Sequence, residues 1–143
     1  MRAVSLFSLR PAPDVDAERT SSLWRDGQPT GTVVPGCVLE AQYAIDARAL
    51  LFVTHDIPYE ETLEILLLDV AGDVVDRASL FRAYVTGSFA AGRIIDDASV
   101  TFRFFGGPER MVRVLATREL RFPFSEPAGV HRPRGLFRWF RIV

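Results

Sequence analysis

Residues 62–70 read TLEILLLDV and predict a strand at the centre of the protein. Leu63 and Leu67 fall on one face of an extended chain, because successive side chains of a strand point to opposite faces. Leu66 and Leu68 fall on the other face, so both faces are apolar. That pattern is typical of a strand covered by further layers on both sides. We therefore expect a central strand here.

The sequence on either side predicts further short strands separated by turns. Residues 38–46 alternate between apolar and polar side chains, and Gly72 lies in a short turn that closes a hairpin. No long amphipathic helical pattern occurs. The fold class predicted is all-β: a single antiparallel β-sandwich or barrel of about eight strands. The expected strands are 38–46, 50–54, 62–70, 74–79, 88–95, 100–104, 111–120 and 136–143.

The N-terminal segment, residues 1–36, differs in composition from the remainder. Pro, Asp, Ser, Thr and Gly dominate between residues 11 and 36, and only Leu23 and Trp24 offer apolar anchors there. Such composition indicates an irregular arm or long loop, which Trp24 could pin to the core. We expect residues 1–36 to be this partly irregular segment and residues 37–143 to form the antiparallel β domain.

The composition describes one ordinary domain of 143 residues with 48% apolar residues. Its single cysteine, Cys37, excludes an intramolecular disulfide and fits a reducing compartment. Residues 1–10 do not form a signal-peptide core, and no apolar run approaches the length of a membrane span. We therefore expect a cytoplasmic protein with no membrane partner. All 17 basic residues are arginine, which indicates a GC-rich bacterial genome rather than selection for anion binding.

Charge is distributed unevenly along the chain. Residues 1–100 carry 8 Arg and 15 acidic residues, whereas residues 101–143 carry 9 Arg and 3 acidic residues. The interpretation we favour is that acidic and basic strands are neighbours in the fold and pair across the sheet. The alternative is a basic face for an acidic partner.

One turn collects a histidine and several carboxylates that could bind a ligand. The residues are His55, Asp56, Tyr59, Glu60, Glu61 and Glu64. Histidine and carboxylate groups can coordinate a divalent cation or act as acid and base. Their spacing matches no known ligand motif, and the interpretation we favour is a solvated acidic turn that keeps the following apolar strand soluble. We expect no metal, no cofactor and no catalytic residue here, and keep the turn as a candidate contact region.

The C-terminal segment mixes arginines with aromatic residues. Arg132 and Arg134 precede the strand FRWFRI at residues 137–142, a composition that could bind single-stranded nucleic acid. The pI of about 6.1 and the absence of an RNA-binding signature make nucleic acid an unfavoured partner. We favour the interpretation that residues 136–143 form a strand whose two faces are both mostly buried. In the preceding strand we expect Ala116 and Leu120 to point inward.

The sequence is compatible with three functions. The first is a non-catalytic protein-interaction or accessory module of a bacterial cell, with another protein as partner and the N-terminal arm contributing. The second is a small-ligand-binding β-barrel or an enzyme, with a polar site near residues 55–64. The third is single-stranded nucleic-acid binding by the C-terminal Arg/aromatic segment. A homo-oligomer is compatible with each of them.

Overall fold

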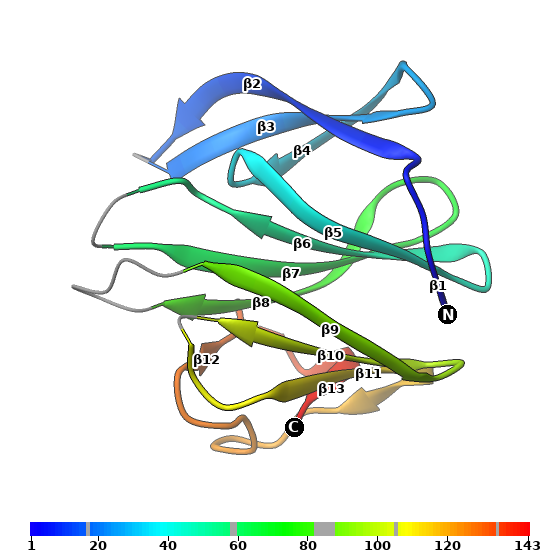
Figure 1. Cartoon of the computed structure of the whole chain (residues 1–143), viewed down its shortest axis with the longest axis vertical. Helices are drawn as coiled ribbons and strands as arrows, with labels where there is room; N and C mark the ends of the chain where they lie inside the picture. The colour runs from blue at the N-terminus through cyan, green and yellow to red at the C-terminus, as the bar shows by residue number, and fades with distance from the viewer. Residues whose placement is uncertain (17, 58–59, 82–87, 105, 134) are drawn as a thin grey trace.

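The chain folds into three antiparallel β-sheets stacked as layers (Figure 1). The computed structural model describes residues 1–143 except 17, 58–59, 82–87, 105 and 134. Nowhere in the described part does a helix of the length and apolarity of a membrane span occur. The all-β prediction is confirmed, and the sheets form a sandwich rather than one closed barrel.

The sheets contain six, four and three strands. The middle sheet has the order β1-β5-β6-β7-β8-β12, with β1 Arg2–Ala3, β5 Val38–Ile45, β6 Arg48–Thr54, β7 Thr62–Leu68, β8 Val74–Phe81 and β12 Val130–His131. The lower sheet in Figure 1 has the order β13-β11-β10-β9, with β9 Phe89–Asp96, β10 Ser99–Phe104, β11 Arg110–Leu120 and β13 Phe137–Ile142. The upper sheet has the order β2-β3-β4, with β2 Phe7–Val15, β3 Glu18–Arg25 and β4 Gln28–Pro35.

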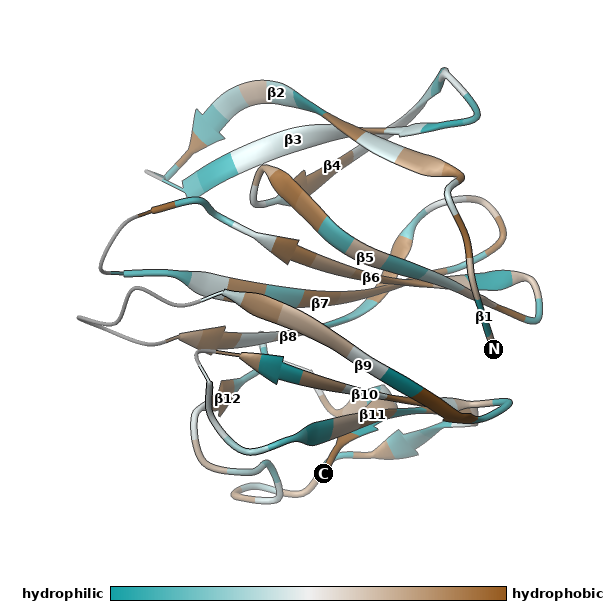
Figure 2. Ribbon diagram, viewed as in Figure 1, coloured by the Kyte–Doolittle hydropathy of each residue, from teal (hydrophilic) through white to brown (hydrophobic). Residues whose placement is uncertain are grey.

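Strand β7 is the central strand that its sequence predicts. It pairs with β6 on one side and β8 on the other. Leu63 and Leu67 are buried in a cluster with side chains of the lower sheet, including Phe102. Leu66 and Leu68 are buried in a second cluster with side chains of the upper sheet. Figure 2 shows hydrophobic colouring along β6 and β7 between the two outer layers.

The N-terminal segment is not the irregular arm that we expected. Residues 7–15, 18–25 and 28–35 form the three strands of the upper sheet. Leu23 and Val34 are fully buried against the middle sheet, whereas Trp24 stays partly exposed beneath Arg10. Only one face of this outer sheet needs apolar residues, so few are present, and its edge strands tolerate proline. The low apolar content therefore resembled that of a loop.

Strand β11 departs from regular alternation, and this corrects two inward assignments. Its pairing with β13 is irregular between Val114 and Glu119. Val112 and Val114 are buried as expected, but Ala116 is exposed and Leu120 is 49% exposed. An irregularity of this kind changes which face the following side chains occupy. The end of β11 therefore turns apolar groups toward solvent.

Gly92 in β9 is required by a close approach to β10. A Cβ at this position would lie within 2.5 Å of the carbonyl oxygen of Thr101. We expect Gly92→Ala to lower the free energy of unfolding by about 1–3 kcal/mol, because the two backbones must separate. Urea denaturation measures the change. Gly135→Ala is the control, since a Cβ there meets nothing within 4 Å; equal midpoints for both variants would show that the backbones are not in close contact.

Candidate functional site

A carboxylate is buried between the middle and upper sheets. Glu64 lies on β7 and is 1% exposed. It follows the alternation of Leu66 and Leu68, so its side chain shares their face toward the upper sheet. An ionised carboxylate in such a place requires charged and hydrogen-bonding partners.

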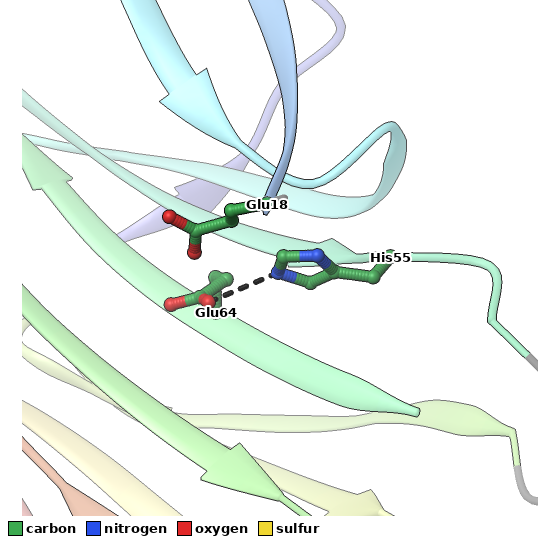
Figure 3. Close-up of side chains that lie close together, drawn as sticks. All are labelled: Glu18, His55 and Glu64. Carbon is green, nitrogen blue, oxygen red and sulfur yellow. Dashed lines mark hydrogen bonds and ion pairs between the residues drawn. The ribbon is translucent and has the colours of Figure 1, made fainter. Parts of the chain in front are cut away.

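Three side chains supply these partners. Arg77 from β8 forms two contacts with Glu64, each 3.0 Å long, from Nε and Nη2 to the two carboxylate oxygens. The hydroxyl of Ser79 donates a 2.6 Å hydrogen bond to Oε2, and Nε2 of His55 lies 3.0 Å from Oε1. Figure 3 shows the His55–Glu64 contact beside Glu18. Both oxygens of Glu64 are thus satisfied from within the chain.

These partners keep Glu64 ionised. Burial acts to raise the pKa of Glu64, but the hydrogen bonds from His55, Arg77 and Ser79, together with the positive charge of Arg77, outweigh burial and lower the pKa. Burial also acts to lower the pKa of Arg77, and its contacts with Glu64 and then Glu18 raise it instead. The two groups therefore form an ion pair.

Glu18 extends the cluster to the upper sheet. Its ligand atoms and those of His55 and Glu64 all lie within 4.8 Å of one another, as in a possible cation site. However, Nη2 of Arg77 donates to Glu18 Oε1 at 2.8 Å and to Glu64 Oε1 at 3.0 Å. The guanidinium thus occupies the place between the carboxylates that a metal ion would take. The arrangement ties β3 to β8.

Ser79 and His55 both contact the Glu64 carboxylate. Ser79 donates its hydroxyl hydrogen to Glu64 Oε2, and His55 contacts Oε1 rather than the serine oxygen. Arg77 binds both of these carboxylate oxygens as well. The contacts of this cluster hold the middle and upper sheets together.

The expected contact residues of this turn divide into three groups. His55 is buried, and Glu61 organises the loop by accepting hydrogen bonds from the backbone N–H groups of His55, Asp56 and Thr62 at 2.7–3.1 Å. Asp56 and Glu60 have exposed side chains. Tyr59 lies outside the described residues. Glu61 therefore has a local structural role, which explains it without a ligand.

Arg132, which we expected as a candidate ligand or partner contact, has a buried side chain that makes several contacts within the chain. Its side chain is 2% exposed, and its Nη1 lies 2.9 Å from Asp76 Oδ1. Its Nη2 donates to the carbonyl of Phe140 at 2.7 Å, and its Nε lies 2.6 Å from Glu126. These contacts join the segment around Arg132 to β8 of the middle sheet and to β13 of the lower sheet. Arg134 lies outside the described residues.

Opposite charges pair partly as we expected from the uneven distribution. Asp76 and Asp96 of the acidic part bind Arg132 and Arg113 of the basic part. Two further arginines, Arg138 and Arg141, bind Glu119. Hydrogen bonds from Arg141 and then Arg138, together with their positive charges, outweigh desolvation and lower the pKa of Glu119 to about 2. Internal pairing therefore accounts for much of the basic character of the C-terminal part.

An apolar patch lies beside these ion pairs. Its residues come from the end of β11, the start of β13 and the loop between them, and each is at least 45% exposed: Leu120, Phe122, Phe124, Leu136 and Phe137. Leu120 pairs with Phe137 across the strands, and the N–H of Arg121 donates to the carbonyl of Leu136 at 2.7 Å. The patch is thus formed by two adjacent segments, with Leu120 beside Phe137 and with Phe122, Phe124 and Leu136 around a common groove. Exposed groups of large apolar side chains are typical of interaction sites.

Phe124 is the least expected member of the patch. Its side chain is fully exposed, at 105%, and its φ is +60°. Pro123 precedes it, and the N–H and hydroxyl of Ser125 both donate to the carbonyl of Phe122. Proline followed by a positive φ is the pattern of a type II turn, in which the third position favours glycine or asparagine. A phenylalanine there costs about 1–2 kcal/mol of backbone strain.

A groove of about 560 Å³ adjoins the patch. Phe122, Phe124 and Leu136 line it together with Arg121 and His131. The guanidinium of Arg118 lies 4.3 Å from the centre of the Phe137 ring. An apolar recess with arginines at its margin can hold an apolar side chain and contact negative charge beside it.

No protein-family model, curated protein or solved structure matches this chain.

Sequence reasoning named His55 and Glu64 but missed their partners Arg77 and Ser79, and it missed the apolar patch. It placed Glu64 in an acidic turn, whereas the register sets Glu64 opposite Ser79 and next to Arg77. A charged residue inside the apolar run 63–68 was an available signal, because a buried charge needs a partner. Phe122 and Phe124 carried a weaker signal, the motif FPF, which places proline at a turn position.

Proposed function

We propose that this chain is a non-catalytic protein-binding module that docks its partner on the apolar patch. Phe124 is the observation that carries the proposal: a fully exposed aromatic side chain on strained backbone. Neither its exposure nor its strain benefits the folded chain alone. Strained residues persist where function requires them, and an exposed aromatic anchor gains its energy when a partner covers it.

The composition of the patch supports a protein as partner. Three phenylalanines and two leucines stand beside Arg118 and Arg121. Aromatic residues and arginine are enriched at the centre of protein interfaces, where a few buried anchors provide most of the binding energy. The upper sheet covers the core residues Leu51 and Leu66, so we assign it to the fold rather than to binding.

The two other functions have less support from the side chains. In the polar site near residues 55–64, Glu61 and Glu64 are already bonded within the chain. For nucleic acid, Arg132, Arg138 and Arg141 are paired with carboxylates. Internally paired groups must lose these contacts before they can bind a ligand. We place the module in the cytoplasm of a bacterial cell, in keeping with its lone cysteine and its arginine-rich composition.

The test uses Phe124→Gly, which removes the anchor and suits the turn. We expect this variant to bind the partner at least about 30-fold more weakly, as for loss of a central anchor. Its thermal stability should be equal to or above that of the parent chain, because glycine relieves the strain at positive φ. Capture from host cells identifies the partner, and calorimetry with the purified pair measures affinity.

Val33→Ser is the matched control, because Val33 is an apolar residue 55% exposed on β4 of the opposite layer. A partner retained by this control and lost by Phe124→Gly supports the proposal. A partner bound equally by both variants would refute docking on the patch. Retention of nucleic acid, sensitive to nuclease and to Phe124→Gly, would instead favour the third function.

A further inference from the structure

We infer that the segment docked on the patch is acidic and inserts an apolar side chain into the groove beside Phe124. This inference rests on the proposed function, since it names the chemistry of the partner at the same surface. It follows from the arginines that border the patch and from the apolar side chains that line the groove.

Two arginines at the patch have no carboxylate partner in the described part of the chain. Arg118 stacks on Phe137, and Arg121 donates to the carbonyls of Pro133 and Gly135. Neither takes part in an ion pair among these residues. Their positive charges are therefore available to carboxylates of a partner, which is the usual form of electrostatic complementarity at an interface.

The acidic residues nearby do not cancel these charges. Glu119 is held by Arg138 and Arg141, and Glu126 lies 2.6 Å from Arg132 and 3.2 Å from Arg138. Each carboxylate is thus matched by at least one guanidinium. The border of the patch keeps a net positive charge, although the whole chain has a net charge of −1.

The groove is large enough to admit an apolar side chain of a partner. Its volume is about 560 Å³, and its lining combines Phe122, Phe124 and Leu136 with the charged residues Arg121, Glu126 and Arg132. A leucine or an aromatic side chain in the groove would place neighbouring carboxylates of the same segment close to Arg121. Acidic residues flanking an apolar anchor are therefore the sequence pattern that this surface fits.

A second copy and a lipid surface are less suitable occupants. Two copies meeting through this surface would bring two borders of net positive charge together, and like charges oppose such contact. An anionic membrane attracts each basic residue weakly, and among the described residues of the patch two arginines have no carboxylate partner. A flat lipid surface also leaves the groove unused.

The experiment selects binders from random dodecapeptides displayed on phage, with the full-length chain as bait. We expect peptides in which Asp or Glu flanks a Leu, Phe or Trp. Binding should weaken at least about 30-fold for Phe124→Gly and about fivefold for Arg118→Gln, with the latter effect reduced at high salt. Arg103→Gln is the matched control: Arg103 is exposed on β10 beside the start of β11, at the opposite end of that strand from Arg118.

The outcomes separate the inference from the proposed function. The inference of an acidic partner is wrong if the selected peptides depend on Phe124 but lack acidic residues. It is also wrong if they bind Arg118→Gln as tightly as Arg103→Gln. Either result leaves the proposed protein-binding function unaffected. Peptides that bind independently of Phe124 overturn both. Vesicles containing an anionic lipid form the last arm: retention that requires Phe124 would replace the protein partner by a membrane.

Discussion

Replacing Glu64 by glutamine is expected to lower the free energy of unfolding by about 3 kcal/mol at neutral pH. After the substitution, Glu18 is the one carboxylate among the described residues that still binds Arg77. An uncharged amide then faces the guanidinium donors in place of the Glu64 carboxylate. It also removes the charged acceptor of the Ser79 hydroxyl. Breaking one side of a buried pair costs more than the pair itself contributes, because a charge remains buried without compensation.

The effect should depend on pH in a defined direction. The contacts of Glu64 lower its pKa in the folded state, whereas the unfolded chain titrates near the ordinary value. The stabilisation is therefore complete above that ordinary value and is lost as the pH falls through the lower folded pKa. The difference between the parent chain and Glu64→Gln should shrink as the pH is lowered from neutral to about 3.

Chemical denaturation at several pH values measures both effects. Glu60→Gln is the control, because Glu60 is an exposed carboxylate in the adjacent loop and should change stability by less than about 0.5 kcal/mol. Equal losses for the two variants, or a Glu64→Gln difference that grows in acid, would contradict the buried ion pair.

Asp76→Ala is expected to cost about 3–5 kcal/mol. The Asp76 carboxylate binds Nη1 of Arg132 at 2.9 and 3.0 Å and accepts hydrogen bonds from the N–H groups of Trp139 at 2.6 Å and Phe140 at 3.2 Å. Asp76 lies on β8 and the two aromatic residues on β13, so one carboxylate joins the middle and lower sheets. Its loss leaves a guanidinium that is 2% exposed and two backbone donors to find other partners.

Thermal and urea denaturation test this expectation, with Asp73→Ala as the control. Asp73 lies in the exposed turn before β8 and should change stability by less than about 0.5 kcal/mol. A loss below about 1 kcal/mol for Asp76→Ala would show that the loop carrying Arg132 does not depend on this contact. Because Asp76 also fixes the start of β13, where Phe137 lies, this variant is unsuitable as a control for binding.

The all-β class and the central position of β7 could be predicted from the sequence. The class follows from alternation such as that of residues 38–46, and the central position follows from apolar side chains on both faces of residues 62–68. The same reasoning failed for residues 1–36, since a sheet that covers the core with one face needs few apolar residues. Leu23 and Val34 provide the buried contacts there, among serines, threonines and prolines that are equally common in loops.

The contacts of the candidate residues could not be predicted from the sequence, because they join segments that are distant along the chain. Strand register set Arg77 and Ser79 beside Glu64, and the upper sheet added Glu18. The irregular pairing of β11 and the turn at Phe124 exposed the apolar patch. The physical reason is common to both sites: contacts between distant segments depend on register and turn geometry, and shifting a strand by one residue exchanges its buried and exposed faces.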